Sequence, residues 1–458
     1  MGSSADAFVF FGASGDLARK QIFPALLALS RNGRLEMPVI GVARSGWGDE
    51  QLRDYAVASL REHGETNAAA LTQLVSRLRY IDGDYADADT FTRLRTMLGD
   101  ARCPLHYLAI PPSLFGTVVA SLSHSGCTRG GRVIVEKPFG RDLDSARRLD
   151  ATLHEHLDES AIFRIDHYLG KEPVQNLLYF RFANGFLEPI WNRNHVARVE
   201  ITLAESFGVD GRGRFYEEAG CLRDVVQNHM LQILALLAMD APIDSGPEAL
   251  HDEKLRLFRS VRPLTPDDVV RGQYNGYRAI DGVAADSTVE TFAALRLGID
   301  TWRWAGVPFL LRAGKCLPTT CCEVLATLHA PPQAVFGQRR EHPNTVRFRL
   351  SPEVQTAIGT RVKRPGEGMR GEAVELIAHD DPGDDMSPYE RLLGDAIAGE
   401  HALFTRDDCV EAAWRIVDPV LDDATPLHVY EPGSWGPREA DRLLPDTIWH
   451  TPRRQAEA

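Results

Sequence analysis

The sequence predicts an α/β domain followed by an α+β domain that is built on a large, mostly antiparallel sheet. Three observations lead to this fold class. The chain has 458 residues, more than a single hydrophobic core usually supports. Up to about residue 165, short apolar runs alternate with helical patterns, which is typical of parallel βαβ units. Beyond that point strand-like stretches follow one another without regular helices, so we expect domains at residues 1–165 and 166–458.

The first domain is expected to begin with a strand, a helix and a second strand. Ala7–Phe11 and Val39–Ala43 are apolar runs of strand length, and an amphipathic helix is predicted from Asp16 to Arg31. Two more strands are predicted at His106–Ile110 and Val133–Val135. Because these runs alternate with helices, we expect the strands to be parallel.

The second domain is expected to begin with a helix, because Pro173 suits a first helical turn and Val174–Phe180 continues it. Strand-like stretches then follow at Val196–Glu205, Thr288–Ile299, Val307–Lys315 and Val324–Ala330. The apolar run Met230–Met239 is too short to cross a bilayer, so we predict a buried core helix there.

The composition is that of a globular protein and argues against several classes of partner. Hydrophobic residues make up 44% and charged residues 25%, and the formal net charge of -13 is unlike that of a nucleic-acid-binding surface. The seven cysteines do not suggest a disulfide framework, and the N-terminus lacks the pattern of a signal peptide. We therefore expect a cytoplasmic protein without a nucleic-acid or membrane partner.

A glycine turn joins the first expected strand to the first expected helix. It consists of Gly12, Ala13, Ser14, Gly15, Asp16 and Leu17, and the small residue Ala18 follows. Such glycines permit a tight turn and let a pyrophosphate approach the N–H groups at the helix start, so we predict a Rossmann-type dinucleotide site. The pattern is GxxGxxA and not the commoner GxGxxG, which leaves an ordinary βα turn as the alternative.

The end of the second strand indicates which dinucleotide binds. In Rossmann domains a carboxylate at this place binds the ribose 2′-hydroxyl of NAD, whereas an arginine accommodates the 2′-phosphate of NADP. Here the strand ends Val42-Ala43-Arg44-Ser45, without an acid. Arg44 therefore favours NADP as the cofactor, and a solvated surface arginine is the alternative.

Several polar segments combine residue types that suit catalysis and anion binding. RIDHYLGKE, residues 164–172, lies at the expected domain boundary, a place where ligand sites are common. Other segments of this kind are VEKPFG at 135–140, which follows an expected parallel strand, and CLRDVVQNH at 221–229, which precedes the apolar helix. The alternative for RIDHYLGKE is a solvated polar loop between domains.

In this order and spacing, GASGDLA, VARS, EKPFG, RIDHYLGKE, RDVVQNH and RAGK resemble the glucose-6-phosphate dehydrogenase family. The resemblance extends from about Phe8 to about Leu443. It implies an NADP-dependent enzyme that oxidises C1 of β-D-glucose 6-phosphate to 6-phosphogluconolactone, the entry step of the oxidative pentose phosphate pathway. It also implies that the second domain binds the substrate and that its sheet forms the interface of a homodimer or a dimer of dimers.

The resemblance assigns a role to each matching residue. It makes His229 the catalytic base and Asp166 the carboxylate that orients the imidazole, although an isolated histidine in a helix is more often a core residue. It assigns the 6-phosphate to His167, Tyr168 and Lys171, the sugar hydroxyls to Glu205 and Asp224, and bridging contacts to Lys137 and Lys315. Pro138 corresponds to a proline with a cis peptide bond next to the cofactor. We also expect Phe115 and Lys137 beside the nicotinamide and Asp84 and Tyr85 near the adenosine.

The sequence departs from the family pattern after Lys315. Thr320 stands where the family usually carries another substrate-binding cation, and the segment lacks the basic residues of a second, structural NADP site. Cys316, Cys321 and Cys322 lack the spacing of a zinc site, so we predict no metal and interpret them as small buried residues.

Two alternative functions stay open. The chain could be a related hexose-phosphate dehydrogenase that uses another sugar or NAD. It could also be a catalytically weak paralogue that regulates a true dehydrogenase, an idea supported only by Thr320.

Overall fold

The computed structural model describes residues 4–65, 67–333, 335–336, 343–366, 368–379, 386–445 and 447–452. It divides into two compact units, which are described separately. The first unit comprises Met1–Glu172, Ile243–His251 and Asp385–Glu411, and the second comprises Pro173–Pro242, Asp252–Asp384 and Ala412–Ala458. The first unit therefore takes in two segments that occur late in the chain.

The first unit contains a six-stranded, fully parallel sheet with the strand order β3-β2-β1-β4-β5-β6. Its strands are β1 (Ala7–Phe11), β2 (Val39–Ala43), β3 (Leu78–Asp82), β4 (Pro104–Leu108), β5 (Arg132–Glu136) and β6 (Ile162–Ile165). This strand order is that of dinucleotide-binding Rossmann domains, so the α/β prediction is confirmed.

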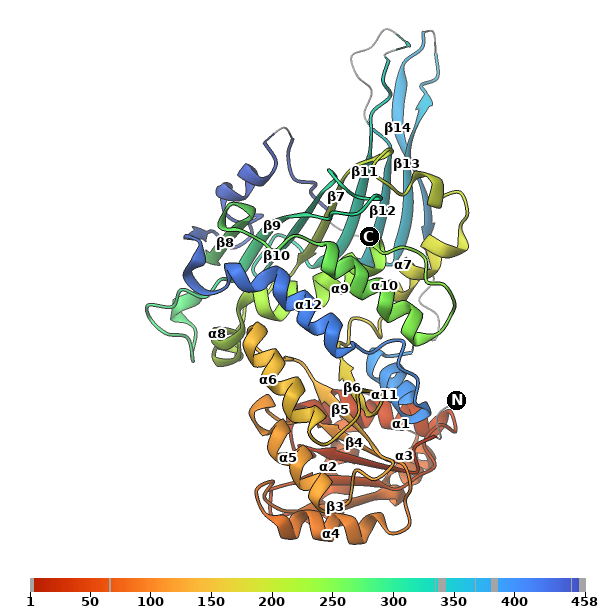
Figure 1. Ribbon diagram of the computed structural model, residues 1–458, viewed down its shortest axis with the longest axis vertical. Coiled ribbons are helices and arrows are strands. Elements are labelled where there is room, and N and C mark those ends of the chain that lie inside the picture. The colour runs from red at the N-terminus through yellow and green to blue at the C-terminus, as the bar shows by residue number, and fades with distance from the viewer. Residues whose placement is uncertain are drawn as a thin grey trace. The chain divides into compact units, whose positions relative to one another are not determined.

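The helices of the first unit cover both faces of this sheet. They are α1 (Phe23–Arg31), α2 (Asp49–Glu62), α3 (Ala68–Arg77), α4 (Ala88–Leu98), α5 (Phe115–His124), α6 (Leu143–His154) and α11 (Pro388–Ala398). Figure 1 shows α1 and α11 on one side of the sheet and α5 and α6 on the other. The predicted helix Asp16–Arg31 is confirmed, although its segment Ala18–Ile22 is a π-helical turn, η1.

Two strands of the first unit lack a clear strand pattern in the sequence. β3 places an exposed Arg79 within the strand, as suits an edge position. β6 contains Arg164, which is 1% exposed and forms ion pairs with Asp150 at 2.8 Å and Glu159 at 2.7 Å. Because these carboxylates compensate the buried charge, a run interrupted by arginine still forms a strand, at the other edge of the sheet.

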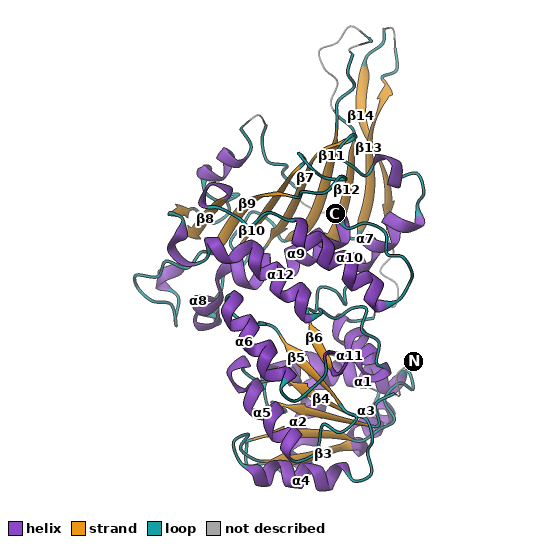
Figure 2. Ribbon diagram, viewed as in Figure 1, coloured by secondary structure: helices purple, strands orange, loops and turns teal. Residues whose placement is uncertain are grey.

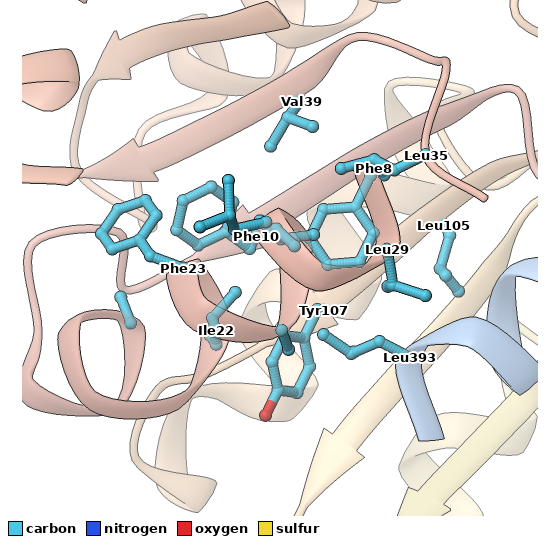
Figure 3. Close-up of a cluster of buried hydrophobic side chains, with 14 of the residues drawn as sticks. Phe8, Phe10, Ile22, Phe23, Leu29, Leu35, Val39, Leu105, Tyr107 and Leu393 are labelled. Carbon is cyan, nitrogen blue, oxygen red and sulfur yellow. The ribbon is translucent and has the colours of Figure 1, made fainter. Parts of the chain in front are cut away.

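The core of the first unit joins residues from both ends of the chain. Figure 3 shows Phe8 and Phe10 of β1 with Phe23 of α1, Tyr107 of β4 and Leu393 of α11. The rings of Phe10 and Phe23 meet edge to face with centroids 5.7 Å apart. Helix α11 is therefore part of the same hydrophobic core as the first strand.

The second unit is built on a nine-stranded sheet with the order β14-β13-β12-β11-β7-β10-β9-β8-β15. The strands, orange in Figure 2, are β7 (Val196–Ala204), β8 (Val269–Tyr274), β9 (Phe292–Gly298), β10 (Pro308–Gly314), β11 (Cys321–Leu328), β12 (Thr345–Ser351), β13 (Gln355–Lys363), β14 (Gly371–His379) and β15 (Leu427–Tyr430). The pairs β7–β10 and β8–β15 are parallel and the other pairs antiparallel. The prediction of a mostly antiparallel sheet is thus confirmed.

The helices of the second part of the chain include the predicted apolar one. They are α7 (Glu172–Ala183), α8 (Gly213–Cys221), η5 (Leu222–Met230), α9 (Leu231–Ala238), α10 (Pro247–Ser260) and α12 (Asp407–Val417). Every residue of α9 is buried, as predicted for a core helix. Within the described residues, no helix has the length and apolar character needed to span a membrane.

All seven cysteines lie in the described part of the chain, and each is a free thiol. Cys321 and Cys322 are buried, in agreement with their interpretation as small core residues, whereas Cys316 is partly exposed.

Candidate functional site

The glycine turn lies between β1 and η1 and has the geometry that a dinucleotide site needs. Gly12 has a φ of +81°, and a Cβ atom at this position would lie 2.2 Å from the Ala109 carbonyl oxygen. Only glycine therefore fits without displacing the neighbouring strand end. The Gly15 N–H donates to the Gly12 carbonyl at 2.9 Å and closes the turn.

Tyr85 holds the glycine turn against β2. Its hydroxyl accepts from the Gly12 N–H at 2.9 Å and donates to the Val42 carbonyl at 3.1 Å. Burial raises the pKa of Tyr85 to about 12, so the phenol stays neutral and keeps its proton for this bond. Tyr85, predicted near the adenosine, is thus in contact with the turn itself.

Arg44 follows β2 and points to solvent beside the same turn. Its side chain is 77% exposed, and one guanidinium nitrogen lies 2.7 Å from the Asp84 carboxylate. The backbone N–H of Ala86 and the Arg44 guanidinium lower the pKa of Asp84. The neighbouring Ser45 hydroxyl donates to Ser14 at 2.6 Å and links the end of β2 to the glycine turn.

These contacts bring most of the predicted cofactor residues together. Ala13 is fully buried, and the exposed Asp16 pairs with Lys20 at 2.9 Å. Phe115, the first residue of α5, is also fully buried, so its ring presents no surface in this conformation. A glycine turn without room for a side chain, together with an exposed arginine at the end of β2, fits a dinucleotide with a 2′-phosphate.

The segment after β6 forms a compact turn. The Leu169, Gly170 and Lys171 N–H groups donate to the carbonyls of the residues three positions earlier, at 3.0, 3.2 and 3.1 Å. The Asp166 carboxylate accepts from the Tyr168 N–H at 3.0 Å, which fixes this side chain at the start of the turn. The Lys171 ammonium lies 3.7 Å from the centre of the Tyr168 ring.

A buried carboxylate, Glu136, lies at the end of β5 next to Lys137. The Tyr107 hydroxyl of β4 donates a hydrogen bond to it, and the phenol of Tyr389 from α11 interacts with the same carboxylate. Burial raises the pKa of Glu136 to about 7, against the opposing effect of the two phenols and Lys137. The peptide bond between Lys137 and Pro138 is cis, as the family resemblance implied.

In the second unit, the parallel neighbours β7 and β10 bring Glu205 and Lys315 together. Ala204 and Gly314 are paired in register, and the Glu205 N–H donates to the Gly314 carbonyl at 3.0 Å. The two side chains that follow form an ion pair. The Lys315 ammonium also lies 5.3 Å from the ring centres of both Phe207 and Tyr216.

His229 and Asp224 lie on the π-helix η5, which runs from Leu222 to Met230. Hydrogen bonds in a π-helix join residues five apart, so residues at this spacing lie over one another on one face. His229 is 5% exposed and Asp224 is partly buried. The π-helix therefore gives the two side chains a common face that an α-helix would not.

The start of η5 is fixed by a buried acid. The Glu290 carboxylate accepts from the Leu222 N–H at 2.9 Å, and its own carbonyl accepts from the Cys221 N–H at 2.9 Å. A Cβ on Gly220 would lie 2.6 Å from this carboxylate. Burial raises the pKa of Glu290, and Arg271 lies 3.7 Å away.

Thr320 lies beside the Glu205 end of β7. Its hydroxyl accepts from the Ser206 N–H at 3.0 Å and lies 2.8 Å from the Ser206 hydroxyl. The threonine is exposed, so a longer cationic side chain at this position would have room to extend into solvent.

Sequence reasoning missed Glu136, Tyr389 and Glu290. Glu136 directly precedes Lys137 in VEKPFG, and Tyr389 lies within the range from Phe8 to Leu443 that the resemblance covers. Attention to these neighbours could have found both residues. Glu290 has no signal in the sequence, because its role depends on a contact with a helix start far from it in the chain.

The Rossmann sheet, the glycine turn with Arg44 and the second, mostly antiparallel sheet define a dinucleotide-binding oxidoreductase. Comparison with known proteins identifies the family. The profile described as glucose-6-phosphate dehydrogenase, NAD binding domain, matches residues 9–176, and that of the C-terminal domain matches residues 178–450. The chain belongs to the glucose-6-phosphate dehydrogenase family.

Individual relatives are similar over nearly their whole length. Glucose-6-phosphate 1-dehydrogenase 1 of Mycobacterium tuberculosis is 44% identical over 445 residues, which cover 97% of this chain and 95% of that protein. A crystal structure of glucose-6-phosphate 1-dehydrogenase from Mycobacterium avium superposes with a TM-score of 0.93 at 45% identity, covering 99% of this chain and all of that one. A glucose-6-phosphate dehydrogenase in complex with its substrate glucose-6-phosphate gives a TM-score of 0.91 at 34% identity, over 99% and 100% of the two chains.

Proposed function

We propose that this chain is a glucose-6-phosphate 1-dehydrogenase, which oxidises C1 of β-D-glucose 6-phosphate to 6-phosphogluconolactone with NADP as the hydride acceptor. The main support is the similarity over 97% of the chain to a protein of that name. The cofactor, when bound, accepts the hydride that leaves C1. The protein must then bind the sugar phosphate, remove one proton and hold the nicotinamide dinucleotide.

His229 is proposed as the base that takes the proton of the anomeric hydroxyl. A neutral imidazole suits this step, because it titrates near neutral pH. Its place on η5, whose start is fixed by Glu290, gives it a defined orientation. Asp166 is proposed as the carboxylate that stabilises the imidazolium, and its bond from the Tyr168 N–H holds it in place for that role.

The other proposed contacts follow the chemistry of the substrate. His167, Tyr168 and Lys171 offer donors and a cation to the 6-phosphate, and they share the compact turn after β6. Glu205 and Asp224 accept hydrogen bonds from the sugar hydroxyls, and Lys137 and Lys315 bind at the sugar and the cofactor. Without substrate, Glu205 is held by Lys315, so both partners are positioned before the sugar arrives.

NADP is proposed to bind along the glycine turn, from Gly12 to Leu17, with its 2′-phosphate on Arg44. Asp84 and Tyr85 are proposed to border the adenosine, whereas the buried ring of Phe115 would reach the nicotinamide only in another conformation. In support, Arg44 is exposed and adjacent to the turn, and its present partner Asp84 is itself on the surface. A phosphate dianion is a stronger partner for a guanidinium than one exposed carboxylate.

We further propose a cytoplasmic homodimer or dimer of dimers, in which the large sheet of the second domain forms the subunit contact. Residues 1–165 are proposed as the cofactor domain and residues 166–458 as the domain for substrate and assembly, with the difference that residues up to Glu172 and the segments Ile243–His251 and Asp385–Glu411 pack with the first unit. Size-exclusion chromatography with light scattering measures the assembly, and a monomer at micromolar concentration contradicts this part of the proposal.

Reduction of NADP in the presence of glucose 6-phosphate tests the activity. We expect wild-type turnover and a loss of at least about a hundredfold in kcat for His229→Asn, because a general base contributes 10²–10⁴-fold. The matched control is His195→Asn, which alters an exposed histidine of the same unit and leaves kcat within about twofold. Equal rates for wild type and His229→Asn refute the assignment.

The same assay separates the alternatives. Faster turnover with galactose 6-phosphate or with NAD favours a related hexose-phosphate dehydrogenase. Binding of glucose 6-phosphate without turnover favours a regulatory paralogue, the possibility to which Thr320 points.

A further inference from the structure

Helix α11 is anchored to the first unit, although it occurs late in the chain. Its residue Glu390 accepts from the Asn32 amide at 2.9 Å, and Arg132 donates to the carbonyls of Ala396 and Ile397, both at 3.2 Å. Leu393 lies in the core of that unit (Figure 3). The helix start is also defined, because the Ser387 hydroxyl accepts from the Glu390 N–H at 3.1 Å.

The first turn of α11 meets the turn after β6. A Cβ on Gly170 would lie 2.7 Å from the Pro388 carbonyl oxygen, so glycine allows a close approach of the two backbones. Arg391 of α11 forms an ion pair with Glu172, the residue that follows the turn. The position of the turn is therefore set in part by α11.

Tyr389, in the first turn of α11, lies against His167 of the turn after β6. Its phenol also interacts with the carboxylate of Glu136, which is 9% exposed. Its ring lies nearly parallel to the His167 imidazole, with 8° between the planes and 6.4 Å between the centroids. The Tyr168 ring meets the imidazole at 64°, with centroids 5.2 Å apart. His167 thus has two aromatic rings as neighbours.

We propose that Tyr389 is a positioning residue for His167: its ring, carried by the anchored helix α11, sets the plane of the imidazole for the phosphate of the substrate. The inference rests on the proposed function of His167. The anchors of α11 restrict Tyr389, since the residue lies in the capped first turn of a helix that is hydrogen-bonded to Asn32 and Arg132. A preoriented imidazole loses less freedom when the phosphate binds, which improves affinity and leaves the chemical step unchanged.

The alternative is that the carboxylate and its two tyrosines only stabilise the fold. Tyr107→Phe is the matched control, because it removes the other phenol from Glu136 and leaves the stacked pair intact. A purely structural network lowers the thermal stability in Tyr107→Phe and Tyr389→Leu and leaves the KM for glucose 6-phosphate alike in both.

The test compares steady-state kinetics of wild type, Tyr389→Leu, Tyr389→Phe and Tyr107→Phe. An aromatic pair contributes about 0.5–1.5 kcal/mol, so we expect Tyr389→Leu to raise the KM for glucose 6-phosphate about 2- to 10-fold. The kcat and the KM for NADP should change by less than about twofold. Tyr389→Phe keeps the ring and should recover most of the affinity. An unchanged KM in Tyr389→Leu, or an equal rise in Tyr107→Phe, overturns the proposal.

Two further measurements keep the result decisive. Should Tyr389→Leu fail to fold, Tyr389→Met fills a similar volume without a ring and tests the same expectation. Calorimetric titration with glucose 6-phosphate, which needs no turnover, separates this inference from the proposed function. Binding that is weaker in Tyr389→Leu than in wild type supports the positioning role even without turnover, and equal binding overturns it. A wild type that does not bind glucose 6-phosphate refutes both.

Discussion

The substitution Glu136→Gln removes the charge of a buried carboxylate that interacts with the phenols of Tyr107 and Tyr389. It keeps the shape of the side chain and an oxygen that accepts from a phenol. In the native protein the carboxyl faces Tyr107 from β4 and Tyr389 from α11, with Lys137 next in sequence and the Asp166 charge nearby. Burial is the largest influence and raises the pKa of Glu136 from its usual 4.5 to about 7.

The size of the effect follows from this pKa. Between pH 4.5 and about 7 the folded protein retains a proton that the unfolded chain releases, so the stability of the first unit falls as the pH rises through this window. At about 1.4 kcal/mol for each pH unit, the rise from 4.5 to about 7 corresponds to about 3 kcal/mol. Glu136→Gln has no such proton and should lose this dependence. The difference in unfolding free energy between Glu136→Gln and wild type should therefore shift by about 3 kcal/mol in favour of the variant from pH 4.5 to pH 8.

Amide hydrogen exchange read by mass spectrometry measures this difference locally, because it gives the opening free energy of β5 even if the two units unfold separately. The exposed Glu155 of the same unit provides the control substitution Glu155→Gln. A difference between Glu136→Gln and wild type that stays constant from pH 4.5 to pH 8 refutes the reasoning. A difference that grows at low pH refutes it too, because the sign would then be that of a stabilised carboxylate.

Three further predictions concern the cofactor and the substrate. Arg44→Ala should raise the KM for NADP about 10- to 100-fold, because a hydrogen bond to a charged group contributes about 1.5–3 kcal/mol. The KM for NAD should stay nearly unchanged, and an equal effect on both cofactors contradicts the role of Arg44. Gly12→Ala should abolish NADP binding in a fluorescence titration, because its Cβ would lie 2.2 Å from the Ala109 carbonyl oxygen. The control is Gly33→Ala, because Gly33 also has a positive φ, +66°, but has open space where a Cβ would lie. This variant should bind NADP normally. An equal loss of NADP binding in both variants would point to backbone strain and not to the steric clash. Thr320→Lys should lower the KM for glucose 6-phosphate, because it adds a cation near the Glu205 end of β7. Thr320→Met, the control with a long uncharged side chain, should not lower it. Equal KM values for the two variants contradict this expectation.

The sequence predicted those elements whose pattern is local. β1 and β2 are short, uniformly apolar strands. A glycine turn follows β1 and an arginine follows β2, so the sequence predicted both the bounds of these strands and the cofactor site at their ends. Of the nine strands in the second sheet, β7, β9, β10 and β11 were predicted, with shifted ends, whereas β8, β12, β13, β14 and β15 were not predicted. The predicted strand Thr288–Ile299 begins only at Phe292. The residues before it form hydrogen bonds outside the ladder, because the Val289 carbonyl accepts from the Gln273 amide and the Glu290 carboxylate accepts from the Leu222 N–H.

The parts that could not be predicted depend on contacts distant in sequence. Nothing in the apolar pattern of 221–239 shows that hydrogen bonds shift to the π register around His229, since side-chain hydrophobicity does not report that register. The attachment of α11 to the first unit is equally hidden, because its partners Asn32 and Arg132 are hundreds of residues earlier. The roles proposed for His229, Asp166 and the substrate residues came from the family resemblance and stay predictions.

The place of α11 in the first core has a consequence for biosynthesis. During translation the six parallel strands emerge early, but the surface that receives Leu393 stays bare until the chain has been made as far as α11. An early nascent chain therefore exposes an apolar face of the first unit, which is a binding surface for chaperones and for premature association. A fragment truncated after residue 172 should show the same defect, with low solubility, and co-expression of a peptide that spans 386–411 should rescue it.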